Sequence, residues 1–150
     1  MANSALTVES VVVGRPSSAA LPPVQLKLAS ERVTVREIIR CAVREQVERL
    51  LREKQMDARN VRAALERQYL SEADVHDQVL TGKVRFPSEA DGQVPSIDVE
   101  VETERAFDGF RSRAFRVLID DQAAEDLDRE FIVHPRTTVT FLRLVPLAGG

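Results

Sequence analysis

Two glycines, Gly149 and Gly150, close the sequence and give its last carboxylate unusual access. Because glycine has no Cβ, a pair of them can pass through a narrow channel and bring a main-chain carboxylate close to a nucleotide or a thiol. The chemistry open to such a group is activation of the carboxylate and transfer to a nucleophile. Terminal glycines are also common in frayed chain ends. The sequence leaves open whether Gly150 is the native end or is exposed by processing.

The residues before the glycines are typical of a strand. In the run TTVTFLRL, Val139 and Phe141 would share one face of a sheet and Leu142 the other. If Val139 and Phe141 point inward, Leu142 and Leu144 point outward and form a small apolar patch suited to a partner. The alternative is that Leu144 packs beneath a neighbouring segment.

A short handle joins this strand to the glycines. Pro146 stiffens it and removes one backbone donor. We predict that partners bind the handle and the patch together, and that Gly149 and Gly150 carry the conjugation chemistry. The predicted partner-binding residues are Leu142, Leu144, Val145, Pro146, Leu147 and Ala148.

Other residues with chemical potential lack the spacing of an active site. The two histidines, His76 and His134, are far apart and match no metal-ligand or nucleophile-base pattern. Acidic pairs fall at predicted turns and loops, where solvated carboxylates are normal. These pairs are Asp120-Asp121 and Glu125-Asp126. We therefore expect no enzyme activity, no metal and no cofactor.

Composition indicates one domain spanning residues 1–150, long enough to bury a core. The single cysteine, Cys41, cannot form an internal disulfide and suggests a reducing compartment. We expect it to be half-buried and structural, because neither neighbour is a base. No apolar run approaches the roughly 20 residues of a membrane span, so we expect a cytoplasmic protein that does not bind membranes.

The charge pattern argues against nucleic acid as a partner. Net charge is −3 and the two signs are interspersed, so no broad basic face is expected. Of 21 basic residues only Lys27, Lys54 and Lys83 are lysines. Arginine stays protonated and cannot act as an amine nucleophile, so few side chains could accept a second copy of the chain. Arginine codons in a GC-rich genome explain the bias equally well.

The first third of the chain predicts a hairpin and a helix. Residues 6–13 and the strictly alternating residues 24–28 read as two antiparallel strands. Thr34 and Glu37 have the spacing of a capping box, which predicts a helix from there to about Lys54. Apolar residues recur along it at three- and four-residue steps: Val35, Ile38, Ile39, Ala42, Val43, Val47, Leu50 and Leu51.

The middle and last thirds predict a helical insertion followed by more strands. Residues 57–69 and 71–80 have helical periodicity within an insertion at about 56–96, which ends in a Pro- and Gly-containing loop. Residues 97–101 alternate as a third strand and 115–119 form a fourth. Two segments stay ambiguous: 106–113 as a helical turn or bulged connection, and 125–133 as a compact loop or one-turn helix.

Three stretches carry a resemblance to the ubiquitin-like β-grasp family. They are Thr34–Ile39 at the helix start, Leu127–Ile132 between the last two strands, and Thr138–Leu144 before the diglycine. The resemblance covers residues 6–54 and 97–150. It implies an α+β fold, with a mixed sheet of about four to five strands around one long helix and a helical insertion after that helix.

The resemblance implies a protein modifier. An ATP-dependent E1-like enzyme would adenylate Gly150, an E2-like enzyme would carry it as a thioester, and it would be conjugated to a target protein. Gly149 would let the tail fit these enzymes and a deconjugating peptidase. Pro146 and the insertion depart from the usual family pattern. The scarcity of lysine and cysteine resembles bacterial ubiquitin-like modifiers.

Two alternatives use the same fold. In a sulfur carrier, Gly150 would become a thiocarboxylate, although such carriers are shorter than this chain. In a non-covalent β-grasp adaptor, Gly149 and Gly150 would be incidental. Removing the glycines would leave partner binding intact in an adaptor and abolish transfer in the other two.

Overall fold

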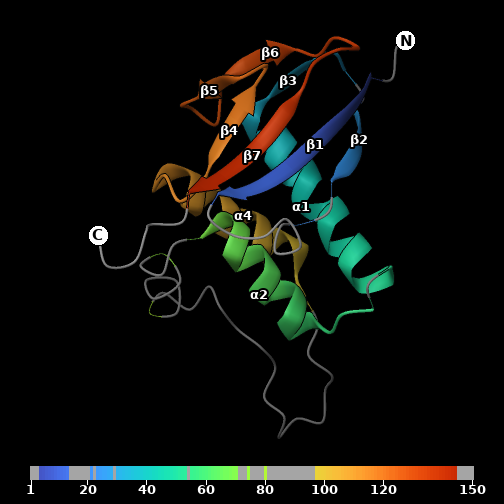
Figure 1. The fold of residues 1–150 in the computed structure, drawn as a ribbon, viewed down its shortest axis with the longest axis vertical. Coiled ribbons are helices and arrows are strands. Elements are labelled where there is room, and N and C mark those ends of the chain that lie inside the picture. The colour runs from blue at the N-terminus through green and yellow to red at the C-terminus, as the bar shows by residue number, and fades with distance from the viewer. Residues whose placement is uncertain are drawn as a thin grey trace, which may run out of the picture.

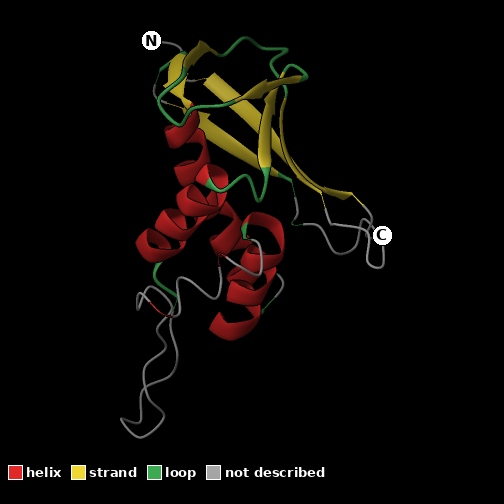
Figure 2. Cartoon of the chain, turned by 90° about the vertical axis from the view of Figure 1, so that its left-hand side faces the viewer, coloured by secondary structure: helices red, strands yellow, loops and turns green. Residues whose placement is uncertain are grey.

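A mixed five-stranded sheet with helices packed on one face forms the structure (Figures 1 and 2). This computed structural model describes residues 4–13, 21, 23–28, 30–53, 55–70, 74, 80 and 97–144. The strands of the sheet are, in spatial order, β2 (Val24–Leu28), β1 (Ser4–Val13), β7 (Val139–Leu144), β4 (Arg116–Ile119) and β5 (Gln122–Ala124). The helices are α1 (Val35–Arg52), α2 (Ala58–Tyr69) and α4 (Val99–Arg111). The predicted α+β class is confirmed.

The predicted N-terminal hairpin is confirmed. β1 and β2 pair antiparallel, and β2 alternates buried and exposed residues along its whole length. β7 lies between β1 and β4, parallel to β1 and antiparallel to β4. β7, the last strand in the described part of the chain, therefore occupies the middle of the sheet, beside β1.

The predicted capped helix is also confirmed. The Glu37 amide donates to the Thr34 hydroxyl at 3.2 Å, and the Thr34 amide donates to the Glu37 carboxylate at 3.4 Å. Two of the amides at this helix end thus have partners. The apolar stripe is buried as predicted except for Leu51, which is exposed, while Gln46 joins the buried face.

α2 matches the helix predicted at residues 57–69. Its N-cap Asp57 accepts from the Asn60 amide at 2.8 Å. The second helix predicted at 71–80 lies outside the described residues, apart from Asp74 and Leu80, which are helical. The loop predicted after it lies outside them too.

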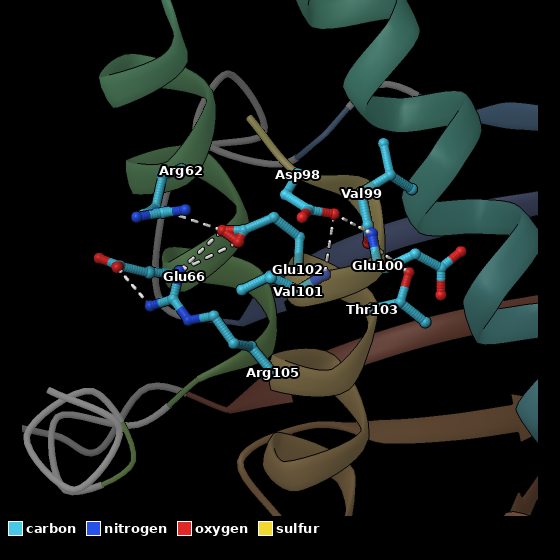
Figure 3. Close-up of polar contacts among 9 residues, drawn as sticks. All are labelled: Arg62, Glu66, Asp98, Val99, Glu100, Val101, Glu102, Thr103 and Arg105. Carbon is cyan, nitrogen blue, oxygen red and sulfur yellow. Dashed lines mark hydrogen bonds and ion pairs between the residues drawn. The ribbon is translucent and has the colours of Figure 1, made fainter. Parts of the chain in front are cut away.

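The strand predicted at residues 97–101 is wrong, because this segment begins helix α4. Asp98 is its N-cap and accepts from the amides of Glu100 and Val101 at 3.0 and 3.4 Å (Figure 3). Five alternating residues are too few to separate a strand from the first turn of a helix. The longer pattern decides it, since Phe107 and Phe110 are buried further along the same helix. The helical alternative for residues 106–113 is the correct one through Arg111.

The predicted fourth strand is confirmed as β4, and a tight turn joins it to β5. Asp120 and Asp121 both have positive φ, 50° and 68°, as a two-residue type I′ hairpin requires. The Asp120 carboxylate also accepts from the Thr138 amide at 2.9 Å. This aspartate therefore links the hairpin turn to the chain just before β7.

The interpretation of residues 125–133 as loop or one-turn helix missed a strand. Glu130–Ile132 forms β6, which pairs antiparallel with β3 (Arg32–Thr34) in a separate two-stranded sheet. Three residues are too short to display an alternation. The pairing also depends on a partner remote in sequence, so no local signal announces it.

Candidate functional site

The open face of the sheet carries a small apolar patch. Leu142 is half-buried there, opposite in register to Val11 of β1, which is 38% exposed. Leu118 of β4 pairs with Ala123 of β5 on the same face. We call Val11, Leu118, Ala123 and Leu142 the open-face patch. The predicted outward orientation of Leu142 is confirmed.

Polar residues lie among and beside these four residues. Glu9 pairs with Thr140, and Arg116 pairs with Leu142. Glu9 and Arg116 are exposed, and Thr140 is half-buried. Apolar and polar side chains thus alternate across this face, and protein recognition surfaces also combine the two kinds. Sequence reasoning found Leu142 and missed the other three members.

The missing members had a usable signal. Val11 follows the buried-exposed alternation of β1, and Leu118 follows the buried Val117 in β4, although the alternation stops there because Ile119 is also half-buried. The sequence alone does not show which strands pair or in which register, because β1 and its partner β7 are far apart in the chain. The backbone of Leu144 ends β7. The predicted tail residues Val145, Pro146, Leu147, Ala148, Gly149 and Gly150 lie outside the described residues, so their roles stay predictions.

The opposite face of β7 is tied to α2, the helix within the predicted insertion. The Gln68 side-chain amide donates to the Phe141 carbonyl at 3.0 Å. Arg143 donates to the Glu66 carbonyl at 2.8 Å, close to the C-terminal end of α2, where the helix dipole favours a cation. The insertion therefore contacts the strand that leads to the diglycine.

A buried polar chain joins α2 to α1 and β1. The Tyr69 hydroxyl donates to the Gln46 side-chain carbonyl, and the Gln46 amide donates to the Ser10 hydroxyl at 3.2 Å. Burial raises the pKa of the Tyr69 hydroxyl well above its ordinary value. Tyr69 also packs edge-on against Phe115 and Phe141, with ring centroids 4.9 and 5.8 Å apart.

α2 and α4 meet through a buried ionic network (Figure 3). Glu102 accepts from Arg62 at 2.8 Å and from Arg105 at 2.8 and 3.1 Å, and Arg105 also reaches Glu66 at 2.5 Å. Near the end of α4 a Cβ on Gly109 would overlap the Tyr69 carbonyl oxygen, so glycine permits this close approach. The carboxylates of Glu66 and Glu102 are both bonded to guanidinium groups, and this network joins α2 to α4.

The remaining candidates do not gather into a reactive cluster. Cys41 is half-buried as expected, and burial raises the pKa of its thiol, which disfavours the nucleophilic thiolate. His134 is exposed, and His76 lies outside the described residues. Within the described ranges, histidine, cysteine, aspartate and glutamate side chains form no group of three that could hold a metal ion. The Asp126 carboxylate accepts from the Asp128 amide at 3.0 Å within a turn.

Comparison with protein-family models, with curated proteins and with solved structures finds no match to this chain. Among the described residues, no helix is long and apolar enough to cross a membrane.

Proposed function

We propose that this chain is a ubiquitin-like modifier with a β-grasp fold, conjugated through the carboxylate of Gly150. The observation that carries the proposal is the position of β7. The sheet is mixed, with the order β2-β1-β7-β4-β5 and with β7 central and parallel to β1, and a mixed sheet of about four to five strands is what the resemblance to the β-grasp family implies. Residues 145–150 follow this strand directly, and they span at most about 20 Å when fully extended. That length suits entry of the diglycine into an enzyme's channel.

The chemistry takes place on the tail and is performed by partner enzymes. In an E1-like enzyme the Gly150 carboxylate attacks the α-phosphate of ATP, forming an acyl-adenylate and releasing pyrophosphate. A cysteine thiolate then displaces AMP to give a thioester. Exchange onto an E2-like cysteine and attack by an amine of the target complete the transfer and release the thiol. Gly149 gives the tail the narrow backbone that these active sites need.

The folded part of the chain supplies recognition. The open-face patch presents apolar side chains with polar ones between them, as a partner surface can, and it includes Leu142, close to the start of the tail. An activating enzyme, a conjugating enzyme and a deconjugating peptidase would each need such a surface, because the tail alone carries little to distinguish it.

The test is intact mass spectrometry of the chain after incubation with ATP and soluble extract of its host. The full-length chain is compared with one that lacks Gly149 and Gly150. We expect covalent adducts for the full-length chain alone, and only when ATP is present. A mass change that replaces one oxygen by sulfur would identify a sulfur carrier instead. Partners that co-purify equally with both chains, without any adduct, would leave a non-covalent adaptor.

A further inference from the structure

A cavity of about 470 Å³ opens where α4 ends. The residues that line it all precede the tail, residues 145–150, in the sequence. Its walls come from α1, from the end of α4 and the turn into β4, and from the segment between β5 and β6. Four of the lining residues are arginines: Arg36, Arg111, Arg113 and Arg116. The buried rings of Phe110 and Phe115 also line it.

Two of these four arginines have partners and two are available. Arg36 pairs with Asp128 at 3.2 Å, and Arg111 pairs with Asp108 at 3.2 Å. The side chains of Arg113 and Arg116 make no hydrogen bond or ion pair within the part of the chain that the structure describes. Both residues are exposed. Two positive charges at the mouth of one cavity are therefore open to an anionic ligand.

The backbone of Arg113 supplies an independent observation. Its φ is 66°, in the left-handed region that favours glycine. Here it ends α4 in a Schellman motif, in which the Arg113 amide donates to the Phe110 carbonyl at 3.1 Å and the Ala114 amide to the Gly109 carbonyl at 2.8 Å. Glycine would satisfy these bonds without strain. A long cationic side chain at this position suggests that its guanidinium has a use outside the fold.

We propose that this cavity binds an acidic segment of a partner protein, with Arg113 and Arg116 pairing to its carboxylates. Guanidinium matches carboxylate with two parallel hydrogen bonds. The lining also includes three carboxylates, those of Glu125, Asp126 and Asp128, of which Asp128 pairs with Arg36. They repel a dense polyanion such as nucleic acid more than they repel one or two carboxylates spaced along a peptide. Five of the twelve lining residues are apolar, so apolar side chains of such a segment also have contacts.

The location favours a protein partner. Arg116 lies opposite Leu142 in the β4–β7 register, so the cavity adjoins the open-face patch. A protein that covers this patch with apolar residues can place an acidic stretch on Arg113 and Arg116 without changing position. This inference goes beyond the modifier activity and does not depend on Gly149 or Gly150.

The experiment measures binding of a short fluorescein-labelled peptide of glutamate, aspartate and leucine by fluorescence anisotropy at low salt. We compare the full chain with Arg113→Gly, Arg116→Gln and the double variant. Arg44→Gln, an exposed arginine elsewhere on α1, is the matched control. Each single variant is expected to weaken binding about threefold and the double variant about tenfold, because each removes one partly solvated ion pair. Added salt should weaken binding to the unsubstituted chain.

Arg113→Gly separates binding from folding. It should raise the melting temperature by relieving the left-handed backbone while it weakens the peptide complex. Loss of affinity therefore cannot be attributed to unfolding. The proposal is overturned if the peptide does not bind, if the double variant binds it unchanged, or if Arg44→Gln loses as much affinity. Displacement of the peptide by equimolar inorganic phosphate would also overturn it, in favour of a small-anion site. Removal of Gly149 and Gly150 should leave peptide binding unchanged. The binding experiment therefore tests the cavity independently of the modifier proposal.

Discussion

The two faces of β7 differ in their burial and in their contacts with the rest of the fold. On the helix side, Phe141 is 0% exposed, and its carbonyl and the Arg143 side chain are both bonded to α2. On the open side, Leu142 is half-buried beside the exposed Val11. Alternate side chains of this one strand thus meet two different environments, because they point to opposite faces of the sheet. Substitutions on one side should act on stability, and substitutions on the other should act on recognition.

The largest effect should come from a pair of adjacent truncations in β7. We expect Phe141→Ala to lower the free energy of unfolding by about 3–5 kcal/mol, because it empties space at the aromatic cluster of Tyr69 and Phe115. Leu142→Ala should cost about 1 kcal/mol or less, since its side chain is only partly buried. Urea denaturation of both variants measures the contrast. Equal losses would show that the two faces are not separated in this way.

The helix side can be tested next through its ionic network. Glu102→Gln leaves Arg62 and Arg105 buried with a neutral partner, and we expect a loss of about 3 kcal/mol. Glu104→Gln, on the exposed face of the same helix, is the control and should change stability by less than about 0.5 kcal/mol. Thermal unfolding followed by circular dichroism measures both. A stable Glu102→Gln variant would mean that apolar packing alone fixes α2 on α4.

A smaller effect is expected at high pH from Tyr69, the only tyrosine in the sequence. Burial raises its folded-state pKa above the unfolded value of about 10, so its contribution to stability is complete below that pH. Above it, the unfolded chain loses a proton that the folded chain keeps. Stability should then fall by about 1.4 kcal/mol for each further pH unit.

Ultraviolet absorbance of tyrosinate reads this directly. At pH of about 11 the folded chain should show little tyrosinate, whereas the chain in denaturant should show it almost completely. Tyr69→Phe should remove the tyrosine contribution to the pH slope. Full ionisation in the folded chain at that pH would show that the Tyr69 side of β7 is open to water.

Local sequence signals predicted the elements whose determinants are local. The strict alternation of residues 24–28 and the capping box of Thr34 and Glu37 correspond directly to β2 and α1. The alternation over residues 97–101 misled, because it is too short to exclude the first turn of α4. β5 and β6 have only three residues each and depend on their partners. No pattern within either strand could have identified them.

The candidate site was predictable in part for a similar reason. Parity within β7 placed Leu142 correctly, since it needs only one strand. The rest of the open-face patch requires the register of β1, β4 and β5 against one another. The cavity at the end of α4 was not predicted at all. Its lining residues Arg36 and Arg116 come from segments that meet only in the folded chain.

The parallel pairing of β1 with β7 also has a consequence for biosynthesis. Residues 8–13 find their partners only when residues 139–144 have been made, so the sheet cannot close on a shorter nascent chain. Contacts of such long sequence separation form late and slowly. During synthesis the edge of β1 that pairs with β7 stays without this partner until residues 139–144 have been made. The residues that follow β7 are therefore attached to a sheet that closes only once β7 itself has been made.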